Sequence, residues 1–414
     1  MLSFVKISDM SKMPGLLCSL VHSVFPEIFG NEIIKAGLVL AMFGGSEKFA
    51  GESKVRGEIH VLIIGDPGLG KSKMLLSVCG VLPKSTYVCG NFTTTAGLTI
   101  SLTHDPVSGD FIAEAGALVL SDNGVCCLDE FDKIENHRSL YEVMEQQRVT
   151  VAKGGVVCSV PTRTTVVAAT NPKFGHFKRD RSLKQNIKFD SALLSRFDLV
   201  FVLQDNLDEG HNLDISNYIL SNNRGFTGTQ TSSDFILSRL RQDPFLEGLK
   251  RKEETAIFSI DVLREYISYA KSSVSPVLSR QARELLKSFY LSIRKSQDVT
   301  IRDLESLIRL CEARAKTELR SIATKKDAEF VVELFKRSMF KETGSEKRSR
   351  GGFKGFLEIL KTKSREARQN VFTMEELGEF MSRAGIEKPT HEFIDTLNSK
   401  GVLLKKGRDA YQLL

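Results

Sequence analysis

Paired cysteines of the C-x-x-C type are missing from this sequence, although its 414 residues include seven cysteines. Thiols at that spacing commonly hold structural zinc, so their absence argues against a zinc site within this chain. Most of the cysteines stand in apolar runs, which predicts reduced core residues in a cytosolic or nuclear protein. The seven are Cys18, Cys79, Cys89, Cys126, Cys127, Cys158 and Cys311.

Long apolar runs are also missing, and so are internal repeats. No run approaches the roughly 18 residues that cross a bilayer, and the N-terminus lacks the charged and apolar regions of a signal peptide. Hydrophobic residues make up 41% and charged residues 26% of the chain, as in ordinary globular proteins. We therefore expect a soluble protein of two or three domains, neither secreted nor embedded in a membrane.

The chain carries a modest basic excess. Lysine and arginine number 58 against 51 aspartates and glutamates, which gives a net charge of +7. This charge is compatible with a polyanionic partner, but a solvated basic surface without such a partner fits equally well.

The spacing of apolar residues predicts an α/β fold. Short apolar runs alternate with helical segments from Glu58 onward, and that alternation indicates a parallel sheet. The four runs are His60–Ile64, Val125–Leu128, Thr165–Ala169 and Leu199–Leu203. Ahead of them, two helices are expected within residues 16–43, in a helical preface that covers residues 1–57.

Further segments follow the α/β core, which is expected to occupy residues 58–206. Residues 207–257 are polar and without a period, so they predict a linker or mobile loop. Residues 258–340 return to helical spacing without a convincing strand, and they predict a helical lid. A charged, glycine-rich linker at 341–352 precedes residues 353–414, whose expected three helices and terminal hairpin outline a winged helix.

The most specific motif is GDPGLGKS at residues 65–72, which fits G-x-x-x-x-G-K-[ST] and follows an apolar run. Its glycines let backbone N–H groups face phosphates, and the following helix presents its positive N-terminal end to them. Lys71 is expected to contact the β- and γ-phosphates of ATP, and Ser72 to ligate Mg²⁺. The predicted cofactor-binding residues are Gly65, Asp66, Pro67, Gly68, Leu69, Gly70, Lys71, Ser72 and Asp129.

An acidic pair, Asp129 and Glu130, stands at the end of the second apolar run. Taken alone, two acids after a strand are more often helix-capping residues. Their place after the phosphate-binding motif favours a catalytic interpretation, in which Asp129 holds the metal's water shell. Glu130 is then the general base that polarises the attacking water, a task for a carboxylate beside the metal.

Two more polar residues flank the later apolar runs. Asn171 ends the third run and could orient water against the γ-phosphate, although an isolated Asn-Pro is usually a turn. Arg196 precedes the fourth run and is a candidate arginine finger, because phosphoryl transfer develops negative charge that a planar cation stabilises. By spacing alone, an ordinary surface arginine is the alternative.

Read together, GDPGLGKS, LDEFDK, AATNP and ALLSRFDL resemble the minichromosome maintenance (MCM) family of AAA+ helicase subunits over about residues 16 to 338. IRDLESLIRLCEARAK at 301–316 is similar to the lid helix of that family. The segments YVCGNFTTTAGLTISL, SGDFIAEAGALVL and AKGGVVCSVPTRT, with the tail LNSKGVLLKKGRDAYQLL, are similar to the subfamily of the eighth MCM paralogue. They extend the resemblance to the C-terminus. Family members carry an oligonucleotide-binding domain, often with a zinc module, ahead of the ATPase, so we expect an isoform, a fragment or an incomplete gene model.

The resemblance implies a homo- or heterohexameric ring whose ATP sites are shared between subunits. One subunit's ATP is expected to contact Lys71, Ser72, Asp129, Glu130 and Asn171. Arg196 and Arg302 are expected to reach into a neighbour's site, and with Glu130 and Asn171 they complete the predicted catalytic set. The family likeness further implies nuclear work in homologous recombination and in double-strand break or crosslink repair, with the ninth MCM paralogue or other MCM subunits as partners.

DNA contacts are expected at two places. Residues 149–157 alternate on both sides of a Gly-Gly turn and predict a hairpin, which the family places at the ring's central channel. Lys153 at its tip suits a phosphate contact without sequence preference, while a solvated turn lysine is the alternative. In the tail, strands at 402–404 and 409–413 flank a turn that carries Lys405, Lys406 and Arg408. These three weakly favour DNA, and protein docking stays open.

The sequence is compatible with three candidate functions. The leading one is an ATP-driven DNA helicase or translocase subunit acting on a single strand or a fork. A non-motor subunit that binds ATP and DNA only to stabilise or regulate a ring is the second. A transcription-activating AAA+ remodeller is the third, and the absence of a G-A-F-T-G-A loop from residues 91–115 argues against it.

Overall fold

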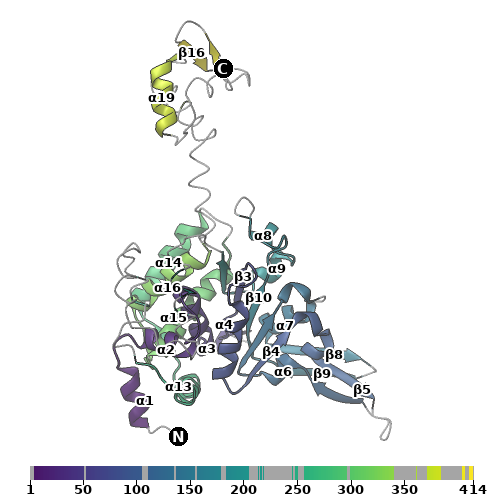
Figure 1. Ribbon diagram of the computed structural model, residues 1–414. Coiled ribbons are helices and arrows are strands. Elements are labelled where there is room, and N and C mark those ends of the chain that lie inside the picture. The colour runs from purple at the N-terminus through teal and green to yellow at the C-terminus, as the bar shows by residue number, and fades with distance from the viewer. Residues whose placement is uncertain are drawn as a thin grey trace. The chain divides into compact units, whose positions relative to one another are not determined.

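The computed structural model describes the greater part of the chain, in two compact units that comprise Met1–Met339 and Phe340–Leu414 (Figure 1). The described residues are 4–50, 53–104, 111–134, 137–153, 156–178, 183–204, 256–295, 299–339, 371–383, 403–405 and 410–413, with single residues between 213 and 249 and at 360. Within these ranges, no helix is both long and apolar enough to pass through a lipid bilayer.

Five parallel strands form the central sheet of the first unit, in the order β11-β3-β10-β7-β4. The α/β prediction is therefore confirmed, and each of the four apolar runs forms a strand. These strands are β3 (Val61–Gly65), β7 (Val125–Asp129), β10 (Thr165–Thr170) and β11 (Leu199–Leu203), and all their residues are buried. The edge strand β4 (Ser85–Cys89) is half exposed and was not predicted from the sequence.

Side chains along each central strand alternate between two hydrophobic cores, as the period of a strand requires. Val61 and Ile63 of β3 pack into a core with the helices α2 (Leu16–Val24), α3 (Glu32–Phe43) and α4 (Lys71–Val81). Leu62 and Ile64 point into the other core, which includes the helix α7 (Arg138–Gln146). Layers on both faces explain why these strands read as continuous apolar runs.

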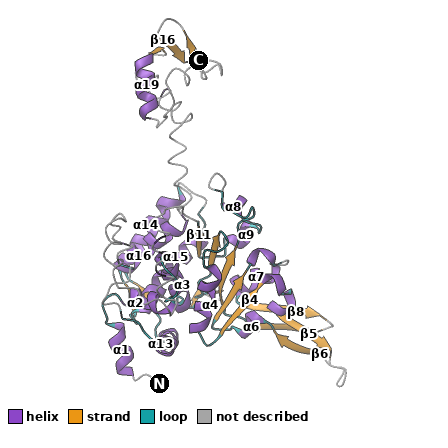
Figure 2. Ribbon diagram, viewed as in Figure 1, coloured by secondary structure: helices purple, strands orange, loops and turns teal. Residues whose placement is uncertain are grey.

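Two antiparallel hairpins extend from the sheet domain in the same direction (Figure 2). One is β5 (Ile100–His104) with β6 (Phe111–Ala115), and the other is β8 (Arg148–Lys153) with β9 (Val156–Pro161). The second confirms the hairpin predicted at residues 149–157, while its Gly-Gly turn lies outside the described residues. The first was not predicted.

Short elements complete this part of the unit. They are α1 (Phe4–Ser11), β1 (Lys48–Ala50), β2 (Ser53–Val55), η1 (Gly90–Phe92), α5 (Thr95–Leu98), α6 (Ala117–Leu120), η2 (Phe131–Lys133), α8 (Leu183–Asn186) and α9 (Ser191–Leu194). Strands β1 and β2 pair antiparallel.

The lid contains four helices that pack against the first core: α13 (Ile260–Ser273), α14 (Arg280–Arg294), α15 (Ile301–Thr317) and α16 (Lys325–Met339). Thr300 and Asp303 form a capping box at the start of α15, which fixes where this helix begins. The expectation that residues 258–340 hold no strand is wrong in one detail. Two-residue strands β12 (Val277–Leu278) and β13 (Ile322–Ala323) pair in parallel. They join the segment before α14 to the segment before α16.

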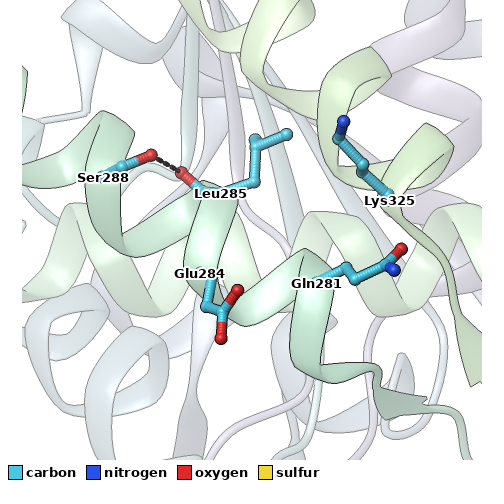
Figure 3. A pocket seen from close by; sticks show the side chains of 5 residues that line it. All are labelled: Gln281, Glu284, Leu285, Ser288 and Lys325. Carbon is cyan, nitrogen blue, oxygen red and sulfur yellow. Dashed lines mark hydrogen bonds between the residues drawn. The ribbon is translucent and has the colours of Figure 1, made fainter.

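A hollow of about 530 Å³ lies on the lid at α14 and the start of α16 (Figure 3). It is lined by Gln281, Glu284, Leu285, Ser288 and Lys325. None of the residues predicted to bind nucleotide or DNA contributes to it.

The second unit contains a three-stranded antiparallel sheet in the order β14-β16-β15. Its described elements are β14 (Val371–Thr373), α19 (Met374–Arg383), β15 (Leu403–Lys405) and β16 (Ala410–Leu413). The predicted terminal hairpin is confirmed, with its first strand displaced by one residue and its second beginning one residue later than predicted. Phe372 and Phe380 meet edge to face in a small core beside this sheet. Lys406 and Arg408 lie outside the described residues.

Candidate functional site

The phosphate-binding motif forms the loop between β3 and α4. Gly68 and Gly70 have φ angles of 84° and 79°, in the left-handed region that favours glycine. Gly65 meets a different requirement, because a Cβ atom there would lie 2.6 Å from the Cβ atom of Leu203 on β11. The loop therefore leads from the carboxyl end of a central strand to the positive end of a helix, which is where anions bind.

Lys71 is the first residue of α4, and its side chain folds back under the loop. Its Nζ donates hydrogen bonds to the carbonyl oxygens of Gly65 at 2.7 Å and Asp66 at 2.6 Å. An ammonium group has three donors, so the loop's own carbonyls engage two of them. Burial lowers the pKa of Lys71, whereas the carboxylates of Asp129 and Asp66 oppose that shift.

The rest of the loop is arranged around Asp66. Its Oδ1 accepts the backbone N–H of Phe177 at 2.9 Å, which joins the loop to the segment after Asn171. Leu69 packs against the first core, while Pro67 and Ser72 are exposed to solvent. The hydroxyl of Ser72, in the first turn of α4, is therefore accessible to a ligand.

Asp129 is the last residue of β7, and both of its carboxylate oxygens are fixed. Oδ1 accepts the backbone N–H of Glu130 at 2.8 Å, and Oδ2 accepts the hydroxyl of Tyr87 at 2.7 Å. Burial, followed by the hydrogen bond to Asp129, raises the pKa of Tyr87. Carboxylate and hydroxyl oxygens are the ligands that Mg²⁺ prefers, with water completing its shell, so Asp129 and Ser72 fit this metal.

Glu130 follows with a left-handed φ of 49°. Its Oε2 accepts a hydrogen bond from the side-chain amide of Asn91, and the thiol of Cys89 lies 3.5 Å from the same oxygen. Gly90 between these residues approaches so closely that a Cβ atom there would lie 2.4 Å from the backbone oxygen of Glu130. The carboxylate is thus held from the side of β4.

Sequence reasoning missed Tyr87, Cys89 and Asn91, which all belong to β4 or to η1 directly after it. In the sheet, Cys89 is opposite Asp129, so this segment continues along the same edge as the acidic pair. Polar residues at the end of a strand were a usable signal, but the strand itself had not been recognised.

Asn171 directly follows β10, which pairs with β3 on one side and β7 on the other. Parallel strands in register place their carboxyl ends at one edge of a sheet. Asn171 therefore leaves the sheet between the strand that leads to Lys71 and the strand that ends at Asp129. The predicted residues on these three strands are brought together.

Arg196 and Arg302 form a second group that is centred on Glu145 of α7. The Nη2 atoms of the two arginines lie 2.6 Å and 2.5 Å from the two carboxylate oxygens of Glu145. Arg196 also donates to the carbonyl of Ala192 at 2.6 Å, and Arg302 to the hydroxyl of Ser195 at 3.2 Å. Glu145 had not been singled out in the sequence.

A buried charge cluster next to this group joins the lid to the sheet. Asp198 accepts hydrogen bonds from Arg309 at 2.6 Å and Ser306 at 2.5 Å, both on α15. Arg56 pairs with the same carboxylate at 3.3 Å. Burial would raise the pKa of Asp198, but Arg309 and Arg56 outweigh it and hold that pKa well below its ordinary range.

The predicted DNA contacts are only partly described. Lys153 is the last residue of β8 and Lys405 the last of β15, and the structure describes their backbone alone. Within the described ranges, no group of three or more His, Cys, Asp and Glu side chains could hold a metal ion.

Comparison with known proteins covers nearly the whole chain. The MCM P-loop domain matches residues 3–223, the MCM AAA-lid domain residues 261–339, and the MCM8 winged helix domain residues 335–414. DNA helicase MCM8 of Homo sapiens is 43% identical over 98% of this chain and 53% of its own length. The Rattus norvegicus protein of that name is 43% identical over 98% of this chain and 54% of its own length.

A plant relative is nearly as similar. Probable DNA helicase MCM8 of Arabidopsis thaliana is 40% identical over 95% of this chain and 54% of its own length. The chain spans about half the length of the curated relatives it matches.

Proposed function

The chain belongs to the minichromosome maintenance family, and from that premise we propose that it is an ATP-hydrolysing DNA helicase or translocase subunit of a hexameric ring. The observation that carries the proposal is the division of its charged residues into two groups. Asp129 ends β7, Glu130 follows it, and Lys71 begins the helix after β3; the carboxyl ends of these two strands share one sheet edge. Arg196 and Arg302 instead converge on Glu145 of α7. This division suits a site that two subunits complete together.

The proposed roles follow from the placement of each residue. The loop N–H groups and Lys71 bind the triphosphate, and Asp129 and Ser72 would hold Mg²⁺. Bound Mg²⁺ would supply charge neutralisation on the phosphate oxygens. Glu130 accepts a proton from the attacking water, and Asn171 orients that water. The neighbour's Arg196 and Arg302 then stabilise the charge that develops in phosphoryl transfer.

Movement along DNA is proposed to depend on the hairpin of β8 and β9. Val157 on this hairpin is 74% exposed, so an apolar side chain lies where a nucleic acid could contact it. Lys153 would contact phosphate without reading sequence, as translocation requires. The second unit, with Lys405, Lys406 and Arg408, would contribute DNA or protein contacts.

The finer assignments rest on the relatives. DNA helicase MCM8 proteins are similar to 98% of this chain. We propose work in the nucleus on single-stranded or forked DNA, in homologous recombination and repair of double-strand breaks or crosslinks. The ninth MCM paralogue or other MCM subunits would be its partners. The division of the chain into a preface of residues 1–57, a core of 58–206, a linker of 207–257, a lid of 258–340, a second linker of 341–352 and a winged helix of 353–414 remains part of the proposal.

Steady-state ATP turnover of the chain with its partner subunit and forked DNA tests this function. Glu130→Gln should bind ATP like the wild type but turn it over at least about a hundredfold more slowly, because the general base is lost. Lys71→Ala should lose ATP binding itself. Glu329→Gln, an exposed change on α16, serves as the matched control. Equal rates for wild type and Glu130→Gln would reject a motor in favour of a binding or regulatory subunit.

A further inference from the structure

We propose that Glu145 is the positioning residue that holds Arg196 and Arg302 together as one cationic clamp for the phosphates of ATP on a neighbouring subunit. This inference rests on the proposed function and names a residue that acts through the two arginines. Glu145 itself would not touch the nucleotide.

The first step is electrostatic. Two guanidinium groups at close range repel each other unless an anion lies between them. The carboxylate of Glu145 takes this position, with Oε2 on Arg196 and Oε1 on Arg302. Two positive charges and one negative charge leave the group with a net positive charge. The group therefore still attracts an anion after the pairing.

The second step concerns orientation. Arg196 lies over the ring of Tyr141 at 4.8 Å, and Tyr141 is one turn before Glu145 on the same helix. The second terminal nitrogen of the Arg302 guanidinium, Nη1, donates to the hydroxyl of Ser195 at 3.2 Å. One face of α7 thus sets the direction of an arginine from the core and of an arginine from the lid.

The third step concerns exposure. The side chains of Arg302 and Glu145 are 40% and 41% exposed, and that of Arg196 is 17% exposed. Ion pairs with this much solvent contact add little to stability. Ordering three charged side chains at the surface instead lowers the conformational entropy that is lost when an anion binds. A phosphate on a facing subunit is the anion that the proposed function supplies.

Glu145→Gln keeps the size of the side chain and removes its charge, so the arginines should separate. We expect kcat for ATP in the complex with the partner subunit to fall about tenfold or more, because two positioned cations are misplaced. Binding of a fluorescent ATP analogue by the variant's own Lys71 loop should be unchanged. Glu145→Asp keeps the charge on a shorter side chain and should recover part of the rate. Glu142→Gln, one turn earlier on α7, is the control, because Glu142 contacts Thr150 and Arg148 rather than Arg196 or Arg302.

A double-mutant comparison separates positioning from a general structural role. In a variant that already carries Arg196→Ala and Arg302→Ala, adding Glu145→Gln should leave kcat unchanged. A further fall in that background would overturn the inference, since Glu145 would then act by another route. A Glu145→Gln rate equal to or above that of the wild type would also overturn it. If the wild-type complex hydrolyses no ATP, the proposed function fails instead, and the two failures are thereby told apart.

Discussion

Asn91 donates its side-chain amide to Glu130, so the carboxylate proposed to activate water is held by a residue from the neighbouring edge of the sheet. The amide occupies Oε2, one of the two carboxylate oxygens that could otherwise contact the attacking water. The thiol of Cys89 lies against the same oxygen. Anything that moves the short helix η1 would therefore change which carboxylate oxygens of Glu130 are available to contact water.

Asn91→Ala should therefore raise ATP turnover in the absence of DNA, by about two- to fivefold, which is a small part of a general base's usual effect. Turnover measured with and without DNA checks this. Phe92→Ala is a suitable control, because Phe92 is the next residue and is 88% exposed. A lower rate for Asn91→Ala would mean that the amide holds Glu130 in its working position.

Tyr87→Phe should weaken the response to magnesium. The Tyr87 hydroxyl fixes one oxygen of Asp129, and removing such outer partners of a metal ligand commonly reduces metal affinity about 10- to 100-fold. We expect half-maximal ATP turnover to need a correspondingly higher Mg²⁺ concentration, with the rate at saturating Mg²⁺ nearly unchanged. An unaltered Mg²⁺ titration would show that the backbone alone positions Asp129.

Asp198→Asn should destabilise the first unit by about 3–5 kcal/mol, because it leaves Arg56 and Arg309 buried without their counter-ion. Its effect should depend on pH. The pKa of Asp198 is lowered in the folded protein, so its stabilisation is present above its unfolded pKa of about 3.9 and is lost as pH falls below that value. Thermal unfolding of the wild type and of Asp198→Asn, measured from pH 7 to pH 3, should show that the difference in stability between the two proteins shrinks. A constant difference would contradict the charge argument.

Lys35→Met tests how the stability of the protein depends on alkaline pH. Lys35 is 1% exposed and bonds the carbonyl of Ile28, and burial lowers its pKa from 10.5 to about 8. Between these values the unfolded chain binds more protons, so the wild type should gain about 3 kcal/mol of stability as pH rises from 8 to 10.5. Lys35→Met should lack this gain, whereas Lys326→Met on the exposed face of α16 should retain it. Parallel slopes for wild type and Lys35→Met in denaturant titrations would refute the assignment.

The sequence allowed the central sheet to be predicted where burial is complete. Strands β3, β7, β10 and β11 are covered on both faces, and continuous apolar residues are the direct result. Strand β4 lies at an edge, mixes polar with apolar residues and is half exposed, so no period marks it. Because this strand was not predicted, Tyr87, Cys89 and Asn91 were not predicted as site residues either. They belong to the site only through their contacts with Asp129 and Glu130.

Glu145 shows a different limit. It lies on an amphipathic helix among other charged residues, and one of its two partners is 157 positions away along the chain. No local pattern distinguishes it from Glu142 one turn earlier. Only the folded arrangement, in which Arg302 of α15 reaches α7, places its carboxylate between Arg196 and Arg302.

The anchoring of α15 to Asp198 has a mechanical consequence. Swinging the lid away from β11 would separate Asp198 from Arg309 in a medium of low dielectric constant, at a cost of about 3–5 kcal/mol. The sheet and the lid of one chain should consequently move together as one rigid body. In the proposed ring, movement would then occur at the interfaces between adjacent chains, where Arg302 and α15 would transmit it from one chain to the next.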